Sequence, residues 1–241
     1  MNPAPKERLI VALDFPSSGE ALEFVEKMGD TIAFYKVGLE LFSAAGPEIV
    51  MRLKSGGKSV FLDLKFHDIP NTVAGASAKA TEMGVDMFNV HALGGKTMMR
   101  AAADAASETA GRLGSERPTV LAVTVLTSLD REALEKEVGL SVSGGVGDFV
   151  AEKARQAKEA GLDGAVASPR EVEKIRAACG EEFHIVTPGV RPAWAAANDQ
   201  KRIATPAEAL AMGADRIVVG RPITRASDPL DAAEKILSEM V

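Results

Sequence analysis

The sequence has 241 residues, a mass of 25.3 kDa and 26% charged residues, values typical of a soluble globular protein with one large domain or two small ones. Its formal net charge of −6 argues against the basic surface that nucleic-acid-binding proteins carry, and no apolar run reaches the roughly 18 residues of a membrane span. The first residues lack the apolar core of a secretory signal, and one cysteine with three histidines argues against a disulfide framework or a Cys/His zinc site, so we expect a cytoplasmic enzyme.

A short apolar run, a turn and a helical stretch follow one another repeatedly along the chain. We predict eight strands, at residues 8–13, 32–37, 59–64, 87–92, 119–126, 164–167, 183–187 and 216–220. We predict helices at residues 18–28, 72–83, 96–110, 131–137, 148–160, 169–178, 206–212 and 229–240. Several of these helices begin at Ser, Thr or Asp and end at Gly, as helix caps require.

One sequence motif occurs three times, at 82–89, 159–166 and 211–218. In this motif the end of a helix is followed by Gly, an apolar residue, Asp and a strand. Tandem βα units produce such repeats, and right-handed crossovers between them give a parallel sheet. Eight units of about 30 residues fit a closed barrel. We therefore predict an α/β protein with a (β/α)8 (TIM) barrel, residues 1–241 forming one domain. A doubly wound open sheet is the alternative, but residues 14–18 lack its G-x-G-x-x-G turn.

Charged residues lie at the carboxyl ends of the first three strands, although strands of a parallel barrel should be almost wholly apolar. They are Asp14, Lys36, Asp63 and Lys65, with Asp68 just beyond. Asp63 and Lys65 are two positions apart, so they share one face of their strand. The fourth strand adds Asn89 and His91 on one face. Because barrel active sites are built at this end, we predict a catalytic site; a structural ion-pair network is the alternative.

The loops after the seventh and eighth strands carry Arg191 and Arg221. Barrel enzymes usually bind phosphate at these loops, and arginine binds phosphate with two parallel hydrogen bonds. Gly220 exposes the backbone beside Arg221, and a long polar stretch at 193–203 contains Gln200. We predict a phosphate site covered by a lid; a surface arginine after a glycine turn is the alternative for Arg221.

Residues 63–72 read DLKFHDIPNT, which resembles the D-x-K-x-x-D-I-x-x-T signature of the orotidine 5′-phosphate decarboxylase family. The segments 11–14, 36–38, 126–128, 187–191, 198–200 and 219–222 resemble the other motifs of the family, in order. The resemblance covers nearly the whole chain and looks like the bacterial type. It implies a homodimeric (β/α)8 enzyme that converts orotidine 5′-monophosphate to UMP and CO2 with neither a metal nor an organic cofactor.

The same resemblance implies a role for each matching residue. Lys65 is the proton donor to C6 of the pyrimidine, and the catalytic array is completed by Lys36, Asp63 and Asp68, with Asp68 entering from the partner subunit. Asp14 and Lys36 hold the ribose hydroxyls, Thr127 faces the pyrimidine edge and Pro188 its ring. The full substrate-binding set is Asp14, Lys36, Asp63, Ile69, Thr72, Thr127, Pro188, Arg191, Gln200, Gly220 and Arg221, with Thr72 reaching across the dimer.

This chemistry needs fixed charges, because loss of CO2 from C6 leaves a carbanion with no adjacent carbonyl to delocalise it. An ammonium beside C6 stabilises the developing anion, and neighbouring carboxylates keep that amine protonated. Two other functions stay open. A magnesium-dependent hexulose-phosphate synthase or keto-gulonate-phosphate decarboxylase needs an acidic ligand near position 36, where this chain has Lys36. A non-catalytic sensor of phosphate ligands needs Arg191 and Arg221 but has no use for Asp63 beside Lys65.

Overall fold

Eight parallel strands close into a barrel in chain order, each strand pairing with the next and β8 with β1. The computed structural model describes residues 4–195 and 204–240. Its strands are β1 (Leu9–Ala12), β2 (Phe34–Gly38), β3 (Ser59–Phe66), β4 (Met87–His91), β5 (Thr119–Val123), β6 (Gly164–Val166), β7 (His184–Thr187) and β8 (Arg216–Val219). The predicted (β/α)8 barrel is therefore confirmed, although β5 ends three residues earlier than predicted and β3 continues two residues further.

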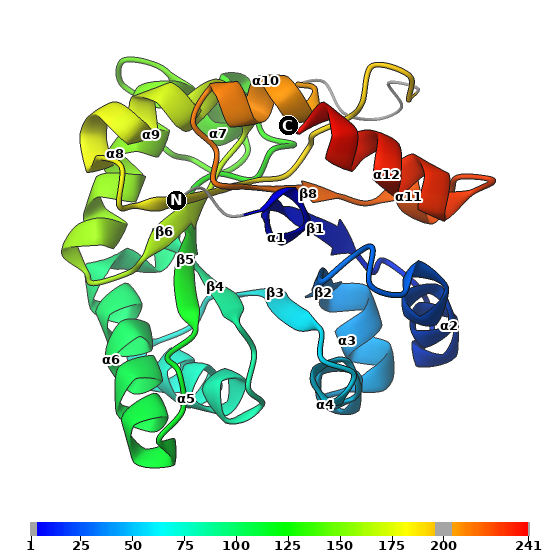
Figure 1. Ribbon diagram of the computed structural model, residues 1–241. Helices are drawn as coiled ribbons and strands as arrows, with labels where there is room; N and C mark the ends of the chain where they lie inside the picture. The colour runs from blue at the N-terminus through cyan, green and yellow to red at the C-terminus, as the bar shows by residue number, and fades with distance from the viewer. Residues whose placement is uncertain (1–3, 196–203, 241) are drawn as a thin grey trace.

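Helices surround the ring of strands (Figure 1). They are α1 (Pro5–Arg8), α2 (Ser18–Met28), α3 (Leu39–Ala45), α4 (Glu48–Ser55), α5 (Pro70–Glu82), α6 (Gly95–Leu113), α7 (Arg131–Lys136), α8 (Val146–Glu159), α9 (Val172–Cys179), α10 (Pro206–Ala211), α11 (Arg221–Thr224) and α12 (Pro229–Glu239), with 3-10 turns η1 (Ala92–Gly94) and η2 (Pro169–Glu171). The helices α1, α3, α4 and α11 are additional to the predicted elements. None of the helices in the described ranges is long and apolar enough to cross a membrane.

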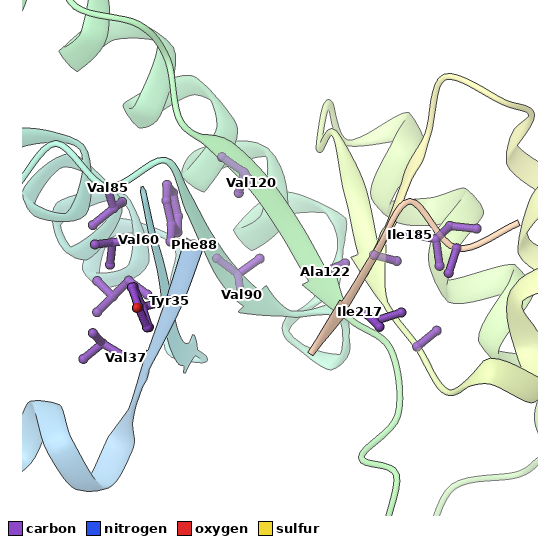
Figure 2. Close-up of a cluster of buried hydrophobic side chains, with 14 of the residues drawn as sticks. Tyr35, Val37, Val60, Val85, Phe88, Val90, Val120, Ala122, Ile185 and Ile217 are labelled. Carbon is purple, nitrogen blue, oxygen red and sulfur yellow. The ribbon is translucent and has the colours of Figure 1, made fainter. Parts of the chain in front are cut away.

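The interior of the barrel is filled by a small apolar cluster separate from the main core. Its members are Ile10, Ala12, Phe34, Phe61, Met87, Leu121, Val186 and Val218. The opposite faces of the strands pack against the helices and form the main core, part of which Figure 2 shows around Tyr35, Val60 and Phe88. Both faces of the strands are therefore buried, as expected for a parallel barrel.

A polar layer lies above this interior cluster on three neighbouring strands. Side chains of a strand return to the same face every second residue, so the residue two positions after each interior residue of β2, β3 and β4 also faces inward. These residues are Lys36, Asp63 and Asn89. The alternation that fills the barrel with apolar side chains therefore also brings polar groups together at its carboxyl end.

The sequence motif that occurs three times has a structural role at the amino-terminal end of the barrel strands. Each copy of this motif places an aspartate directly before an even-numbered strand: Asp86 before β4, Asp163 before β6 and Asp215 before β8. Asp86 shows the pattern, because its Oδ2 accepts hydrogen bonds from the Val60 amide of β3 at 2.7 Å and from Lys54 Nζ at 2.6 Å. The other two aspartates do the same with Val120 and Arg117, and with Ile185 and Arg176. We call these three arrangements the strand clasps, since each joins a strand start to the preceding strand.

Candidate active site

Four charges of alternating sign form a continuous array at the carboxyl end of the barrel. Lys36 Nζ lies 3.1 Å from Asp14 Oδ1 and 3.4 Å from Asp63 Oδ2. The other carboxylate oxygen of Asp63 lies 2.7 Å from Lys65 Nζ. The side chains of Lys36 and Asp63 are only 11% and 14% exposed, whereas that of Lys65 is 31% exposed. The array therefore presents the Lys65 ammonium to the open end of the barrel with Lys36 and Asp63 buried behind it, whereas Asp14, at its other end, is 56% exposed.

The carboxylate of Asp63 is held in its ionised form. Burial alone would raise the pKa of this group, but the charges of Lys36 and Lys65 and the hydrogen bonds from Lys65 and Asn89 outweigh burial and lower it. Both hydrogen bonds reach Oδ1, each at 2.7 Å. Asp63 thus supplies a fixed negative charge that favours the protonated form of Lys65.

Lys65 has an unusual backbone conformation. Its φ is 51°, and in the described part of the chain it is the one residue other than glycine with a positive φ. The pairing of β3 with β4 shifts register between Leu62 and Phe66, so a bulge surrounds Lys65. Such bulges re-aim a side chain next to an active site. The prediction that Asp63 and Lys65 lie close together is confirmed by the 2.7 Å distance between their charged groups. The bulge, and not the regular alternation of side chains along a strand, brings these groups together.

Asp68 lies apart from the array in the single chain. Its Oδ1 accepts a hydrogen bond from the Ile69 amide at 2.6 Å, and among the described residues it forms no ion pair. Ile69 is 66% exposed, and Thr72 is exposed in the first turn of α5. Asp68 and Thr72, for which the resemblance implies contact across a dimer, thus lie on the outer surface of this chain, as does Ile69 of the predicted substrate-binding set.

A cavity of about 160 Å³ joins the array to the loops after β7 and β8. Its lining includes Asp14, Lys36, Pro188, Arg191, Gly220 and Arg221. Arg191 is buried, with 4% exposure, and Arg221 is the first residue of helix α11, where the sequence predicts a turn. The structure therefore brings Asp14 and Lys36, which we predict to bind ribose, into one cavity with Arg191, Gly220 and Arg221, which we predict to bind phosphate.

Four described residues of the predicted substrate site do not line this cavity, namely Asp63, Ile69, Thr72 and Thr127. Thr127 is exposed in the loop after β5 and borders a separate small hollow with Thr124, Ser168 and Glu171. Gln200 lies outside the described residues, together with most of the predicted lid.

Gly38 and Asn89 are neighbours of the array, and sequence reasoning assigned a role to neither of them. A Cβ atom at position 38 would lie 2.8 Å from Lys36 Nζ, so a side chain there would displace the ammonium. The signal for Gly38 is its place two residues after Lys36, on the same face of β2. Asn89 donates to Asp63 and accepts from the Lys65 amide, which its place beside His91 on β4 does not reveal.

His91 stacks on His67 beside the array, with ring centroids 5.1 Å apart and planes 16° apart. Burial, followed by the charges of His67 and Lys65, lowers the pKa of His91 from 6.5 to about 4. Its Nδ1 accepts a hydrogen bond from the Leu93 amide at 3.3 Å, which requires this nitrogen to be unprotonated. His91 is therefore neutral at pH 7.

This shift predicts that His91 destabilises the fold as pH falls. Between pH 6.5 and 4 the unfolded chain binds a proton at His91 that the folded chain does not bind, so the contribution is complete above pH 6.5 and is lost as pH falls towards 4. Since the ring is only partly buried, we expect a loss of about 1 kcal/mol between pH 7 and pH 5. Urea unfolding at both pH values should show a smaller loss for His91→Gln. Equal losses for both proteins would contradict the assignment.

Comparisons with known proteins show which family this chain belongs to. A sequence profile of the family "Orotidine 5'-phosphate decarboxylase / HUMPS" matches residues 7–236. The chain is 55% identical to an orotidine 5′-phosphate decarboxylase of Moorella thermoacetica over 98% of this chain and 92% of the relative. It is 52% identical to one of Syntrophomonas wolfei over 98% of both chains.

Solved structures of this family have a similar fold. The crystal structure of orotidine 5′-phosphate decarboxylase from Lactobacillus acidophilus matches with a TM-score of 0.85 and 40% identity, covering 96% of this chain and 98% of that chain. The corresponding structure from Pyrococcus horikoshii matches with a TM-score of 0.75 and 26% identity, covering 96% and 98%. The chain therefore belongs to the orotidine 5′-phosphate decarboxylase / HUMPS family.

Proposed function

We propose that the charged array decarboxylates orotidine 5′-monophosphate to UMP and CO2, with Lys65 as the proton donor to C6. The activity follows from the family and from relatives of that name with half of their residues identical. The observation that carries the mechanism is the position of the Lys65 ammonium. Through Asp63 it is joined to Lys36, and Lys36 and Asp14 line the cavity that also contains two arginines.

The reaction breaks the bond between C6 and the carboxylate carbon. The electron pair of that bond stays on C6 when CO2 leaves, and the Lys65 ammonium stabilises this developing charge. Lys65 then transfers a proton to C6, which gives UMP, and the neutral amine recovers a proton from solvent. The role of Asp63 in this reaction is electrostatic, because its negative charge keeps Lys65 protonated until the proton is transferred.

The remaining predicted residues bind the substrate. Asp14 and Lys36 hold the ribose hydroxyls, and the phosphate is held by Arg191, Gln200, Gly220 and Arg221. Pro188 packs on the pyrimidine ring and Thr127 faces its edge. The shared cavity supports the ribose and phosphate assignments, because Asp14, Lys36 and both arginines line it.

We also propose that the active form is a homodimer in which Asp68 and Thr72 reach the partner's site. An apolar groove of about 440 Å³ supports it, lined by Phe42, Pro47, Met51, Leu64, Phe66, Ala76, Lys79, Glu82 and Met83. Ile69 and Thr72 precede Ala76 at helical spacing, so they lie on the face of α5 that borders this groove. Exposed Met51, at 53%, and Ile69, at 66%, would be buried by a second copy.

Mixing two inactive variants tests this arrangement. We expect Lys65→Ala and Asp68→Ala to be nearly inactive alone, whereas an equal mixture, unfolded and refolded together, should recover about one quarter of the wild-type activity. The reason is that half of the dimers are then hybrids, each with one intact site made of Lys65 from one subunit and Asp68 from the other. A mixture no more active than its components would contradict the shared site.

An absorbance assay of orotidine 5′-monophosphate turnover, with and without excess EDTA, tests the function itself. We expect rapid formation of UMP in both conditions. The magnesium-dependent sugar-phosphate enzymes of the superfamily need an acidic ligand near position 36, where Lys36 places its ammonium between two carboxylates. Loss of activity with EDTA would favour those enzymes, and binding without turnover by folded dimer would favour a phosphate-ligand sensor.

A further inference from the structure

We infer that Asn89 is a positioning residue of the reaction, which holds the Lys65 backbone and the Asp63 carboxylate in the arrangement that proton transfer requires. The inference rests on the roles proposed above for Lys65 and Asp63. Asn89 lies on β4, its side chain touches neither C6 nor phosphate in that scheme, and it acts through its two partners on β3.

The side-chain amide of Asn89 uses both of its ends. Its Oδ1 accepts a hydrogen bond from the backbone amide of Lys65 at 2.8 Å, and its Nδ2 donates to Asp63 Oδ1 at 2.7 Å. Asp63 Oδ1 is also the oxygen that accepts from Lys65 Nζ at 2.7 Å. One side chain thus fixes the main chain of the proton donor and the carboxylate that holds its ammonium.

The Lys65 backbone needs such a contact because its φ of 51° is unfavourable for any residue with a Cβ atom. Such a conformation persists only where the surroundings determine it. The regular β3–β4 pairing is interrupted between Leu62 and Phe66, so Lys65 lacks a regular ladder partner and its amide bonds to Asn89. Without that bond the backbone can relax, and a displacement of about 1 Å in a reacting group can cost about 100-fold in rate.

The burial of Asn89 restricts which side chains can replace it. The residue is 0% exposed, so a replacement must satisfy the same donor and acceptor without help from solvent. An aspartate at position 89 has the same shape and can accept from the Lys65 amide, but when ionised it has no proton to donate to Asp63. An alanine removes both hydrogen bonds.

The pH dependence of Asn89→Asp separates positioning from packing. Position 89 contacts Asp63 and Lys65 on β3, and Lys36 on β2 binds the other oxygen of Asp63. His91 lies two residues along β4, and the register partner on β5 is the apolar Leu121. Two carboxylates in contact share a proton, which raises one pKa of the pair. As pH falls, the new carboxyl group is protonated and can donate to Asp63 in place of the amide.

We therefore expect kcat of Asn89→Asp, divided by that of the wild type at the same pH, to be about 100-fold low at pH 8 and to rise about tenfold by pH 5. Asn89→Ala should lose about 100-fold at every pH, with KM and the affinity for UMP changed less than about threefold, because the phosphate contacts remain. Thr81→Val is the matched control. It removes a buried hydrogen bond of 2.9 Å, to the Ser77 carbonyl, in the outer helix layer, and its kcat should equal that of the wild type.

Calorimetric binding of UMP and thermal unfolding show that each variant is folded. If Asn89→Ala does not fold, the isosteric Asn89→Asp alone decides the question. A kcat ratio for Asn89→Asp that is near one, or that is low but independent of pH, would overturn the inference. Lys65→Ala is measured in parallel: if it stays active, the proposed mechanism fails, whereas an inactive Lys65→Ala beside fully active Asn89 variants refutes the positioning role alone.

Discussion

Lys65→Ala is expected to lower kcat by about five orders of magnitude while the barrel stays folded. Decarboxylation without an electron sink demands a barrier reduction of order 20 kcal/mol. A single ammonium in contact with the developing charge contributes about 4 kcal/mol at an effective dielectric constant of 20, which corresponds to about three orders of magnitude in rate. Loss of the proton donor removes at least about 100-fold more.

The fold should tolerate this change because the substitution leaves the backbone contacts in place. The hydrogen bond from the residue 65 amide to Asn89 does not involve the lysine side chain, and alanine fits the space that lysine vacates. Initial rates with saturating orotidine 5′-monophosphate, together with thermal unfolding, provide the measurement. Lys136→Ala, on an exposed lysine paired with Glu132 on α7, is the control and should match the wild type. Near-normal turnover by folded Lys65→Ala would end the proposed mechanism.

Arg221→Ala is expected to lower kcat/KM by about 100-fold or more, although the Arg221 side chain does not reach C6 in the proposed complex. Two charge-assisted hydrogen bonds to phosphate contribute about 3 kcal/mol or more. In enzymes of this kind, binding energy from a distant group of the substrate also lowers the barrier to reaction, so kcat should fall together with affinity.

Orotidine, which lacks the phosphate, provides the decisive comparison. Its slow turnover should be the same for the wild type and Arg221→Ala, because the lost contact has no partner in that substrate. Arg155→Ala is the matched control, since Arg155 pairs with Glu152 and Glu159 on α8 and does not line the cavity shared by Asp14 and Arg221. A wild-type kcat/KM for Arg221→Ala, or an equal loss with orotidine, would show that the phosphate is bound elsewhere.

The barrel and its charged end could be predicted from the sequence because both follow from alternation. Apolar runs mark the strands, and a charge two positions after an interior residue is conspicuous in a strand that is otherwise apolar. This logic places Lys36 and Asp63 correctly at the carboxyl end. It fails between 39 and 55, where Gly46, with φ of 63°, and Pro47 separate two short helices, each too short for a clear helical pattern.

The bulge at Lys65 and the contacts of Asn89 could not be predicted in the same way. The sequence does not predict the positive φ of Lys65, because lysine has no preference for that conformation. The hydrogen bonds of Asn89 join residues 24 and 26 positions apart, and they depend on the local register of two strands. Asp68 illustrates another limit, since its proposed role depends on a second copy of the chain.

The strand clasp at Asp86 has a mechanical consequence for the chemistry at the other end of the barrel. Asp86 binds the Val60 amide at the start of β3 and leads directly into β4, so it fixes how far these two strands are offset along their axes. A slip by the two-residue repeat that keeps side chains on their faces moves one strand by about 7 Å against the other. Asn89 would then meet neither Asp63 nor the Lys65 amide. The alignment of the proton donor is thus set in part by an aspartate at the opposite end of the barrel. Substitutions of that aspartate are therefore constrained by the catalytic end of the barrel, although the two ends share no residue.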